Sequence, residues 1–454
     1  MNRLRHLLVA LARALPVVAL LALCLQAAGA RAAVDEGAAG ADTRWWSLSG
    51  QATWTWQGKP PFPAAYSGPN SLRNDRERSY ALTSTVFMGA RPWESGELWF
   101  NPELAQGLPL SNLAGLGGFT NGELARVSGR QARVYRARLF LRQTWNFGAP
   151  GETLETVDAD TNQFAARVAR RRLVLTAGNL SVLDIFDDNA FSHDPRTQFL
   201  NWSLMTHGAY DYAADARGYS QGAALEWFDG DWAVRAGRFA QPREPNQMRL
   251  DNAVFSHFGD QLEIEHAHQL AGQPGKLRFL LFRNRARMAR FEDALAAGTV
   301  PDLNLVRNGE HTKRGWGINL EQALTADLGL FARASRSDGA TEVYAFTEID
   351  RSVSGGLVLR GAAWGRPADR LGVGLAQNAL SAPHRNYLAA GGLGFFIGDG
   401  ALSYRPERIG EAFYSIALGK QASFSLDWQR IVNPAYNADR GPVNVWGARL
   451  HFEY

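Results

Sequence analysis

The chain contains almost no cysteine. Of its 454 residues only Cys24 is one, and it lies within an apolar N-terminal stretch. Beyond that stretch no thiol remains for a disulfide, a cysteine metal site or a redox centre. Long apolar runs are equally scarce. The run from Ala14 to Leu25 spans about a dozen residues, whereas a membrane-spanning helix needs about twenty. Any membrane crossing must therefore be made by strands.

An export signal accounts for that apolar stretch. Arg3, Arg5 and Arg13 come before it, and the tripeptide at 30–32 supplies small residues at the spacing of a cleavage site. This pattern predicts a secretory signal peptide. We expect a signal peptide, a short leader and one outer-membrane barrel domain, at residues 1–32, 33–43 and 44–454 respectively. The expected location is the outer membrane of a Gram-negative bacterium, after the signal peptide is cleaved.

Lysine is scarce as well, with four in the chain, so arginine is the usual cation. Four of the 48 basic residues and none of the 44 acidic ones precede residue 33, which leaves the remainder formally neutral. The basic isoelectric point therefore gives little reason to expect nucleic acid as a partner.

Alternation of apolar and polar residues is the main pattern that is present. In the last strand Trp446, Leu450 and Tyr454 point one way, while Arg449 and His451 point the other. A strand of this kind suits a barrel wall between lipid and a wet lumen. Similar segments occur at 45–56, 79–90, 97–103, 132–145, 167–178, 220–228, 232–239, 261–270, 276–285, 315–324, 328–336, 355–364, 371–379, 412–418, 422–431 and 443–454.

The connections between these segments alternate between short and long. Residues 229–231 and 419–421 are short, whereas 57–78, 104–131 and 179–219 are long. Short periplasmic turns and long external loops produce this rhythm in outer-membrane barrels. We expect an all-β fold, a transmembrane antiparallel β-barrel of about 16 strands with long external loops. The third loop carries so much apolar surface that it should fold into the barrel, although packing over the rim or against a neighbouring subunit is the alternative.

Face assignment places charged side chains inside the barrel. A charge on the lipid face near mid-bilayer costs about 2–4 kcal/mol, so the polar rows of these strands should face the lumen. Two arginine rows on adjacent strands, which cross-strand pairing would bring together, and three acidic residues are expected there: Arg136, Arg138, Arg142, Arg170, Arg172, Glu97, Glu263 and Glu265. Their guanidiniums and carboxylates would hydrogen-bond a passing solute or only brace a wet wall.

The third loop carries its own polar set, which we expect at the constriction: Asp184, Asp187, Asp188, His193, Asp194 and Arg196. Carboxylate and imidazole groups attract divalent cations such as manganese, and aspartates that cap loop turns explain the same residues equally well. The spacing matches no closed calcium loop, so no resident metal site is predicted.

Several segments resemble the OprB-type carbohydrate-selective porins. They are GNLSVLDIFDDN at 178–189, HDPRTQF at 193–199, YSGPNSL at 66–72, FNPE at 100–103 and ARLFLRQ at 137–143. The resemblance implies a sixteen-stranded outer-membrane barrel that admits sugars past an arginine-bearing constriction, with an inward-folded loop and no cofactor. Some relatives of this kind are described as manganese channels, so the resemblance leaves the solute open.

One motif points to other chemistry. Gly218 to Gly222 reads G-x-S-x-G, which would make Ser220 the nucleophile of a lipid hydrolase. A nucleophile elbow needs a strand that turns into a helix, whereas an alternating strand follows here. We therefore predict no enzyme but a passive porin for small polar solutes, with carbohydrates as the expected solutes and a divalent-cation porin as the alternative. The lipid bilayer is its other partner, and a homotrimer is the ordinary expectation for such a barrel.

Overall fold

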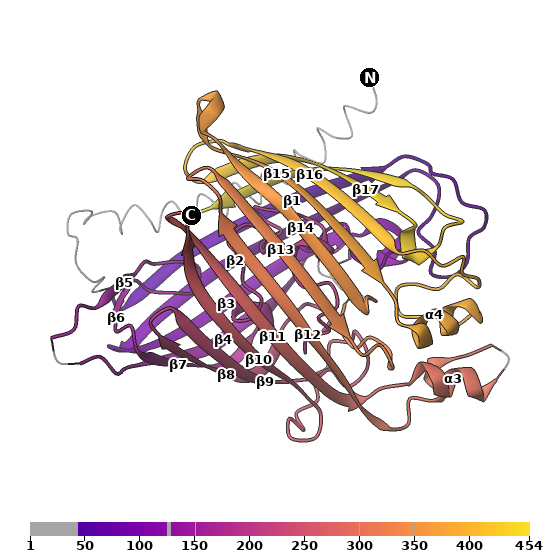
Figure 1. The fold of residues 1–454 in the computed structure, drawn as a ribbon, viewed down its shortest axis with the longest axis horizontal. Helices are drawn as coiled ribbons and strands as arrows, with labels where there is room; N and C mark the ends of the chain where they lie inside the picture. Colours follow the sequence, from indigo (N-terminus) through magenta and orange to yellow (C-terminus); the bar gives the residue numbers. More distant parts are fainter. Residues whose placement is uncertain (1–43, 125–128, 150, 299, 347) are drawn as a thin grey trace.

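The computed structural model describes residues 44–124, 129–149, 151–298, 300–346 and 348–454. The expected signal peptide and leader lie outside these residues. Sixteen antiparallel strands close into one barrel, each paired with its neighbours in the sequence and the last with the first (Figure 1). They are β1 (Trp46–Lys59), β2 (Glu77–Trp93), β3 (Gly96–Leu108), β4 (Arg133–Asn146), β7 (Arg172–Leu180), β8 (Ser220–Asp229), β9 (Trp232–Ala240), β10 (Phe258–Leu270), β11 (Gln273–Arg287), β12 (Glu310–Ala323), β13 (Leu328–Ser337), β14 (Arg351–Gly361), β15 (Arg366–Ala379), β16 (Glu407–Ala417), β17 (Ala422–Val432) and β18 (Val443–Glu453).

The expected barrel and its strand number are confirmed. Several strands begin earlier than their apolar patterns indicated, among them β14 at residue 351 and β16 at residue 407. The added start of β16 contains Glu407 and Glu411, which are buried inside and accept hydrogen bonds from loop amides. Polar residues on an inward face interrupt the apolar pattern, which explains why the sequence suggested a shorter strand.

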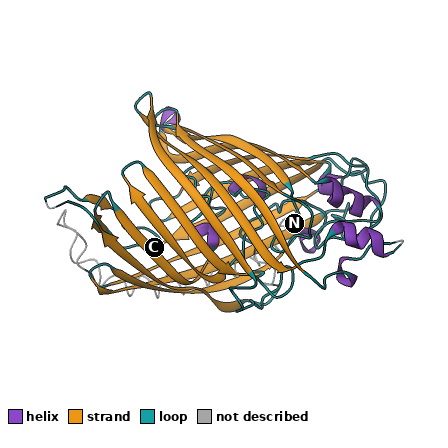
Figure 2. Ribbon diagram, turned by 60° about the horizontal axis from the view of Figure 1, so that its bottom comes forward, coloured by secondary structure: helices purple, strands orange, loops and turns teal. Residues whose placement is uncertain are grey.

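Helices α3 (Phe291–Ala297) and α4 (Ala382–Ala389) lie with the long loops at one end of the barrel (Figures 1 and 2). We call this the loop end, and the opposite end, with the short connections, the turn end. The helical segments are α2 (Trp202–Met205), α3 (Phe291–Ala297), α4 (Ala382–Ala389), η1 (Leu110–Leu113), η2 (Val182–Asp184), η3 (Leu303–Leu305), η4 (Ala362–Trp364) and η5 (Pro434–Tyr436). Of the helices among the described residues, none is long and apolar enough to cross a membrane.

One connection at the turn end is longer than the others. Residues 147–171 contain a small hairpin of β5 (Glu155–Val157) and β6 (Ala166–Val168), which forms its own two-stranded sheet. Phe164 from this connection is buried against Trp99 of β3, with ring centroids 5.0 Å apart. The connection therefore folds into the barrel from the turn end.

The third loop, residues 181–219, folds into the lumen as expected. Its aromatic side chains make the core of the molecule together with inward residues of the wall. Phe199, for example, is fully buried and packs on Phe331 and Phe413, with ring centroids 5.2 and 5.0 Å away. The loop thus fills much of the lumen. The space that remains lies between the loop and the wall strands β3, β4 and β7.

Candidate functional site

Buried charged side chains on strands β10 to β18, the part of the barrel that we call the far wall, hold the third loop in place. Glu411 of β16 accepts the main-chain N–H groups of Leu200 and Asn201 at 2.6 and 2.9 Å. Arg449 of β18 donates to main-chain carbonyls of Pro195 and Gln198. Because these bonds satisfy backbone groups that a buried loop would otherwise leave unpaired, they allow an irregular segment to occupy the interior.

Asp187 is the deepest anchor of the loop. Its carboxylate is fully buried and accepts from Arg333 Nε at 2.8 Å, from Thr206 Oγ1 at 2.8 Å and from Asn319 Nδ2. Burial opposes ionisation, but the charge of Arg333 and the nearby His207 hold the pKa of Asp187 well below its usual range. Asp187 is therefore a structural anion within the protein and is not exposed to a passing solute.

Inward-facing glycines of the wall make room for the loop. A Cβ at Gly329 would lie 2.0 Å from the ring of Phe191, and one at Gly317 would lie 2.4 Å from the ring of His207. A Cβ at Gly374 would also be crowded, but less so, with Leu204 at 3.1 Å. These glycines were not among the predicted site residues. Glycines at inward positions of strands, where side chains normally fill the lumen, were the signal available.

Arg138 joins the wall to the near side of the loop. Its guanidinium makes a two-pronged ion pair with Asp184, with Nε–Oδ2 and Nη2–Oδ1 distances of 2.7 and 2.6 Å. The group also lies over the ring of Tyr219, 5.3 Å from its centroid. Burial disfavours the Asp184 carboxylate, yet Arg138 keeps its pKa below the ordinary value. Two residues predicted for opposite sides of the constriction are thus in direct contact.

A second charged group lies beside the first. Arg196 of the loop pairs with Glu123 at 2.8 Å and with Glu103 of β3 at 3.4 Å. Glu103 also accepts from Thr85 Oγ1 at 2.6 Å and from the hydroxyl of Tyr135. Glu123, which was not among the predicted residues of the lumen, completes this group.

Arg142 lies nearer the turn end. It pairs with Glu97 at 3.3 Å and donates to the main-chain carbonyl of Asn162 at 2.7 Å. Asn162 belongs to the long connection at the turn end, and its side-chain oxygen accepts a hydrogen bond from Asn101 Nδ2 of β3 at 2.7 Å. The predicted residues Arg142 and Glu97 therefore meet, and a segment from the turn end narrows the lumen beside them.

Arg136 does not join this row, contrary to the prediction. The pairing of β3 with β4 shifts between Asn101 and Pro102, so that Ala137 is an extra residue on β4. A bulge of this kind reverses the faces of the residues beyond it. Tyr135, expected outside, consequently reaches Glu103, while Arg136 is exposed.

The prediction that two arginine rows meet was also wrong. Arg142 is opposite Thr176, whereas Arg172 is opposite Asn146, at the turn end of β7. Arg170 precedes the strand and is exposed, with ion pairs to Glu155 and Asp231. Arg170 thus belongs to the turn end, because β7 begins five residues later than the pattern indicated.

Glu263 and Glu265 lie inside the barrel, as expected, but on the far side of the loop. Glu263 accepts the main-chain N–H of Asp187 at 2.8 Å and pairs with Arg235 at 3.1 Å. Glu265 pairs with Arg278 at 2.6 Å. Both carboxylates therefore contribute to the wall that supports the loop.

A cavity of about 440 Å³ remains between the loop and the wall, and we call it the passage. Its charged lining consists of Glu103, Glu123, Asp160, Asp184, Asp194, Glu453, Arg138, Arg142, Arg196 and Arg217, with His193 beside them. Toward the loop end it is lined by aromatic rings. Trp202 stacks on Phe346 and Tyr212, at centroid distances of 5.0 and 6.2 Å. The passage therefore presents an aromatic section followed by a charged one.

The third-loop carboxylates do not gather around one point. Asp188 is largely exposed and lies 3.5 Å from Arg278, while Asp194 caps the turn that leads to Arg196 by accepting its main-chain N–H. Within the described residues no group of three or more His, Cys, Asp or Glu side chains is arranged to hold a metal ion.

Ser220 lies in the barrel wall and its hydroxyl is bonded to the main chain. Its hydroxyl is buried and donates to the main-chain carbonyl of Ala240 at 2.6 Å, and the residue begins β8. A strand follows where a nucleophile elbow requires a helix.

Comparisons with known proteins agree with this geometry. A family model described as "Carbohydrate-selective porin, OprB family" matches residues 89–454. Two curated proteins named Porin AaxA also match. The Chlamydia muridarum protein is 22% identical over 63% of this chain and 54% of its own length, and the Chlamydia pneumoniae protein is 29% identical over 30% and 27%. The chain thus spans about half or less of these relatives.

A solved structure shares the architecture. Pseudomonas putida OprB at high pH is 16% identical and superposes with a TM-score of 0.68, covering 92% of this chain and all of the other. At this identity the likeness concerns the fold.

Proposed function

Because the chain belongs to the OprB family of carbohydrate-selective porins, we propose that it admits small neutral polar solutes, sugars above all, by passive diffusion through the passage. The order of surfaces along the passage carries this proposal. Aromatic rings near the loop end offer flat apolar faces to the C–H side of a sugar ring, and the charged section offers donors and acceptors to its hydroxyls.

The arginines act in pairs in this proposal. Arg138 and Arg196 each bind carboxylates, so the charged section holds fixed forks of donors and acceptors within a narrow space. Paired charges leave hydrogen-bonding capacity for hydroxyl groups without a strong attraction for ions. Transport also requires weak binding, since a tightly held solute would block the passage.

A divalent-cation porin is the second candidate. The passage is lined by six carboxylates and four arginines, and this excess of negative charge favours cations over anions. In this alternative the transported ion is manganese. Asp187 takes no part in it because the carboxylate is fully buried and bound by Arg333.

Solute flux into proteoliposomes that contain the refolded mature chain separates the candidates. We expect glucose to enter and Arg138→Gln to lower its flux about tenfold at low concentration, because one hydrogen bond to a charged group is worth about 1.5 kcal/mol. Arg171→Gln is the matched control, since Arg171 is exposed at the turn end and pairs with Asp229. Manganese entry with glucose excluded would instead establish the cation porin.

The remaining expectations are tested with the same material. Ser220→Ala should leave glucose flux unchanged, and loss of a lipid-hydrolase activity in this variant would favour the enzyme alternative. The homotrimer stays a prediction, which the mass of the detergent-solubilised protein tests.

A further inference from the structure

A row of arginines crosses the outer surface of the barrel near its loop end. Arg314, Arg336, Arg351, Arg408 and Arg430 belong to β12, β13, β14, β16 and β17. All five are exposed, and the residues directly before and after them in these strands are less exposed. They therefore stand on the outward, lipid-facing side of the wall. We call these five residues the arginine belt.

Strand pairing keeps the belt at one height. Arg336 is opposite Arg351 on one side and Trp316 on the other. Arg408 is opposite Gln377, and its Nε donates to the Gln377 amide oxygen at 3.0 Å. Because neighbouring strands are about 4.8 Å apart, the belt extends over roughly 24 Å from β12 to β17.

The guanidinium groups of the belt form no ion pair with the described carboxylates of the protein. One carboxylate, that of Asp338, lies at the belt and accepts the main-chain N–H of Arg314 at 2.7 Å. Nearby on the wall, Asp260 of β10 binds both Arg238 of β9 and Arg283 of β11, at 2.7 and 2.5 Å. Among the described residues, by contrast, no ion pair to a carboxylate is found for any member of the belt. Arg336 and Arg351 even lie directly opposite each other, an arrangement that like charges disfavour. An external anion would remove this repulsion.

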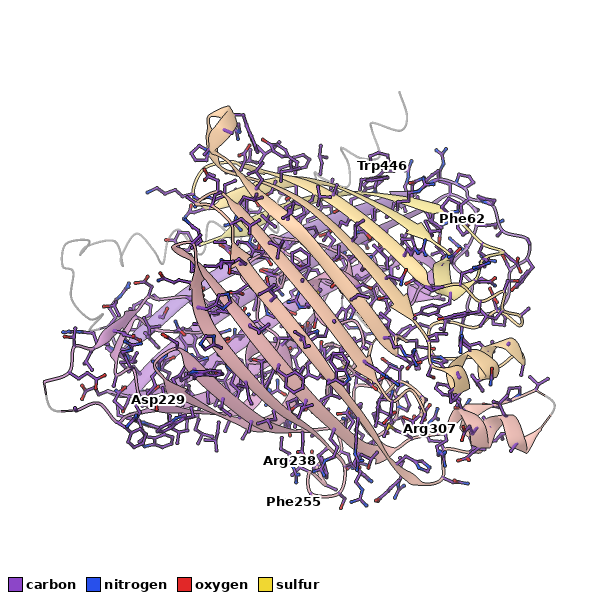
Figure 3. All side chains as sticks on the ribbon, viewed as in Figure 1. Phe62, Asp229, Arg238, Phe255, Arg307 and Trp446 are labelled. Atoms are coloured by element: carbon purple, nitrogen blue, oxygen red, sulfur yellow. The ribbon has the colours of Figure 1, made fainter. Side chains whose placement is uncertain are left out.

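Aromatic residues place the belt at the edge of the bilayer. Trp316 is outward-facing and 37% exposed, and Trp428 and Trp446 lie together with ring centroids 6.2 Å apart (Trp446 in Figure 3). Tryptophan marks the interface in such barrels. Toward the turn end the outward positions are apolar, among them Ile318, Val353, Leu357, Val373, Leu375 and Leu426. The belt is therefore at headgroup depth, where an arginine on the lipid face costs little.

We infer that the arginine belt binds the phosphate groups of lipid headgroups in the outer leaflet. A guanidinium presents two parallel donors that match a phosphate, and the belt offers several at one height. A row of roughly 24 Å on a convex wall is too extended for one small anion but faces several neighbouring headgroups. The long loops lie at this end, so the leaflet in question is the external one.

Titration of the detergent-solubilised mature chain with bisphosphorylated lipid A, followed by tryptophan fluorescence, tests this inference. We expect binding that weakens with salt, and dephosphorylated lipid A should bind far more weakly. Each arginine near an anionic surface is worth about fivefold in affinity, so Arg336→Gln with Arg351→Gln should weaken binding about 25-fold. The matched control is Arg360→Gln with Arg370→Gln, a directly opposed arginine pair at the turn end of β14 and β15.

The outcomes are separable from those for solute flux. Retention of binding by the belt variant, equal loss in the control variant, or equal binding of dephosphorylated lipid A would each overturn the inference. A belt variant that changes only the oligomeric state would point to a protein partner and overturn it as well. If the double variant does not refold, the two single variants and the comparison of the two lipids on the unaltered chain decide the question.

Discussion

Replacing Asp187 by Asn should detach the third loop from the far wall. Asn keeps the size of the side chain and tolerates the positive φ of 59° at this position. It removes the negative charge, however, which in the unaltered protein lies 2.8 Å from Arg333 Nε. The Arg333 guanidinium, with 1% of its side chain exposed, would then be buried without a carboxylate partner. Breaking a buried ion pair in this way costs about 3–5 kcal/mol. We expect this loss to fall on the folded position of the loop, because the strands keep their ladder hydrogen bonds.

Asp188→Asn is the matched control. The two aspartates are adjacent in the sequence, but the Asp188 side chain is 60% exposed and lies 3.5 Å from Arg278. An exposed pair of this kind contributes about 0–1 kcal/mol. The control thus makes the same chemical change in the same loop without breaking a buried pair.

Single-channel conductance in planar bilayers measures the effect. With the loop displaced, Asp187→Asn should give a larger and noisier conductance and a lower midpoint of thermal unfolding, whereas Asp188→Asn should resemble the unaltered protein. If the two variants behave alike, Asp187 does not anchor the loop. Equal conductance together with a lowered midpoint would show that the pair stabilises the barrel without setting the width of the passage.

Two further predictions concern the loops and the wall. Burial alone would lower the pKa of His384, but the carboxylates of Asp350 and Glu348 outweigh it and raise the pKa to about 9. Relative to an ordinary value near 6.5, this contributes about 3 kcal/mol of stability, complete below pH 6.5 and lost as the pH rises through 9. The difference in unfolding midpoint between the unaltered chain and His384→Gln should therefore shrink as the pH rises from 6.5 to 9, and a constant difference across this range would contradict the assignment. Gly329→Ala should push Phe191 off the wall at a cost of about 1–3 kcal/mol and raise the conductance, while an unchanged conductance would show that the ring repacks in place.

The barrel could be predicted from the sequence because its signal repeats in every strand. Alternation every second residue and the rhythm of short and long connections follow from a wall with lipid on one side and water on the other. The inward third loop was predictable for a similar reason, since its aromatic residues had to be buried. These are properties of segments, and they survive errors of several residues at their ends.

Individual site residues were less predictable because their positions depend on pairing. The face of Arg136 was reversed by a single extra residue, Ala137, and only the register with Pro102 reveals it. Asp187 and Asp188 are identical in type and adjacent, yet one is buried and the other exposed. Which of the two turns inward is decided by Arg333, which lies 146 residues later in the chain.

The anchoring of the third loop also concerns the order in which the molecule is assembled. Arg449, which holds the loop through its carbonyls, comes 251 residues after Gln198 and lies on the final strand. The loop therefore cannot acquire this support until the final strand, which also closes the barrel against β1, is in place. The step that completes the barrel wall thus also completes the anchoring of the third loop, which narrows the passage. A barrel arrested before this step would lack the pairing of β1 with β18. It would also lack the anchored loop that limits the size of the solutes it admits.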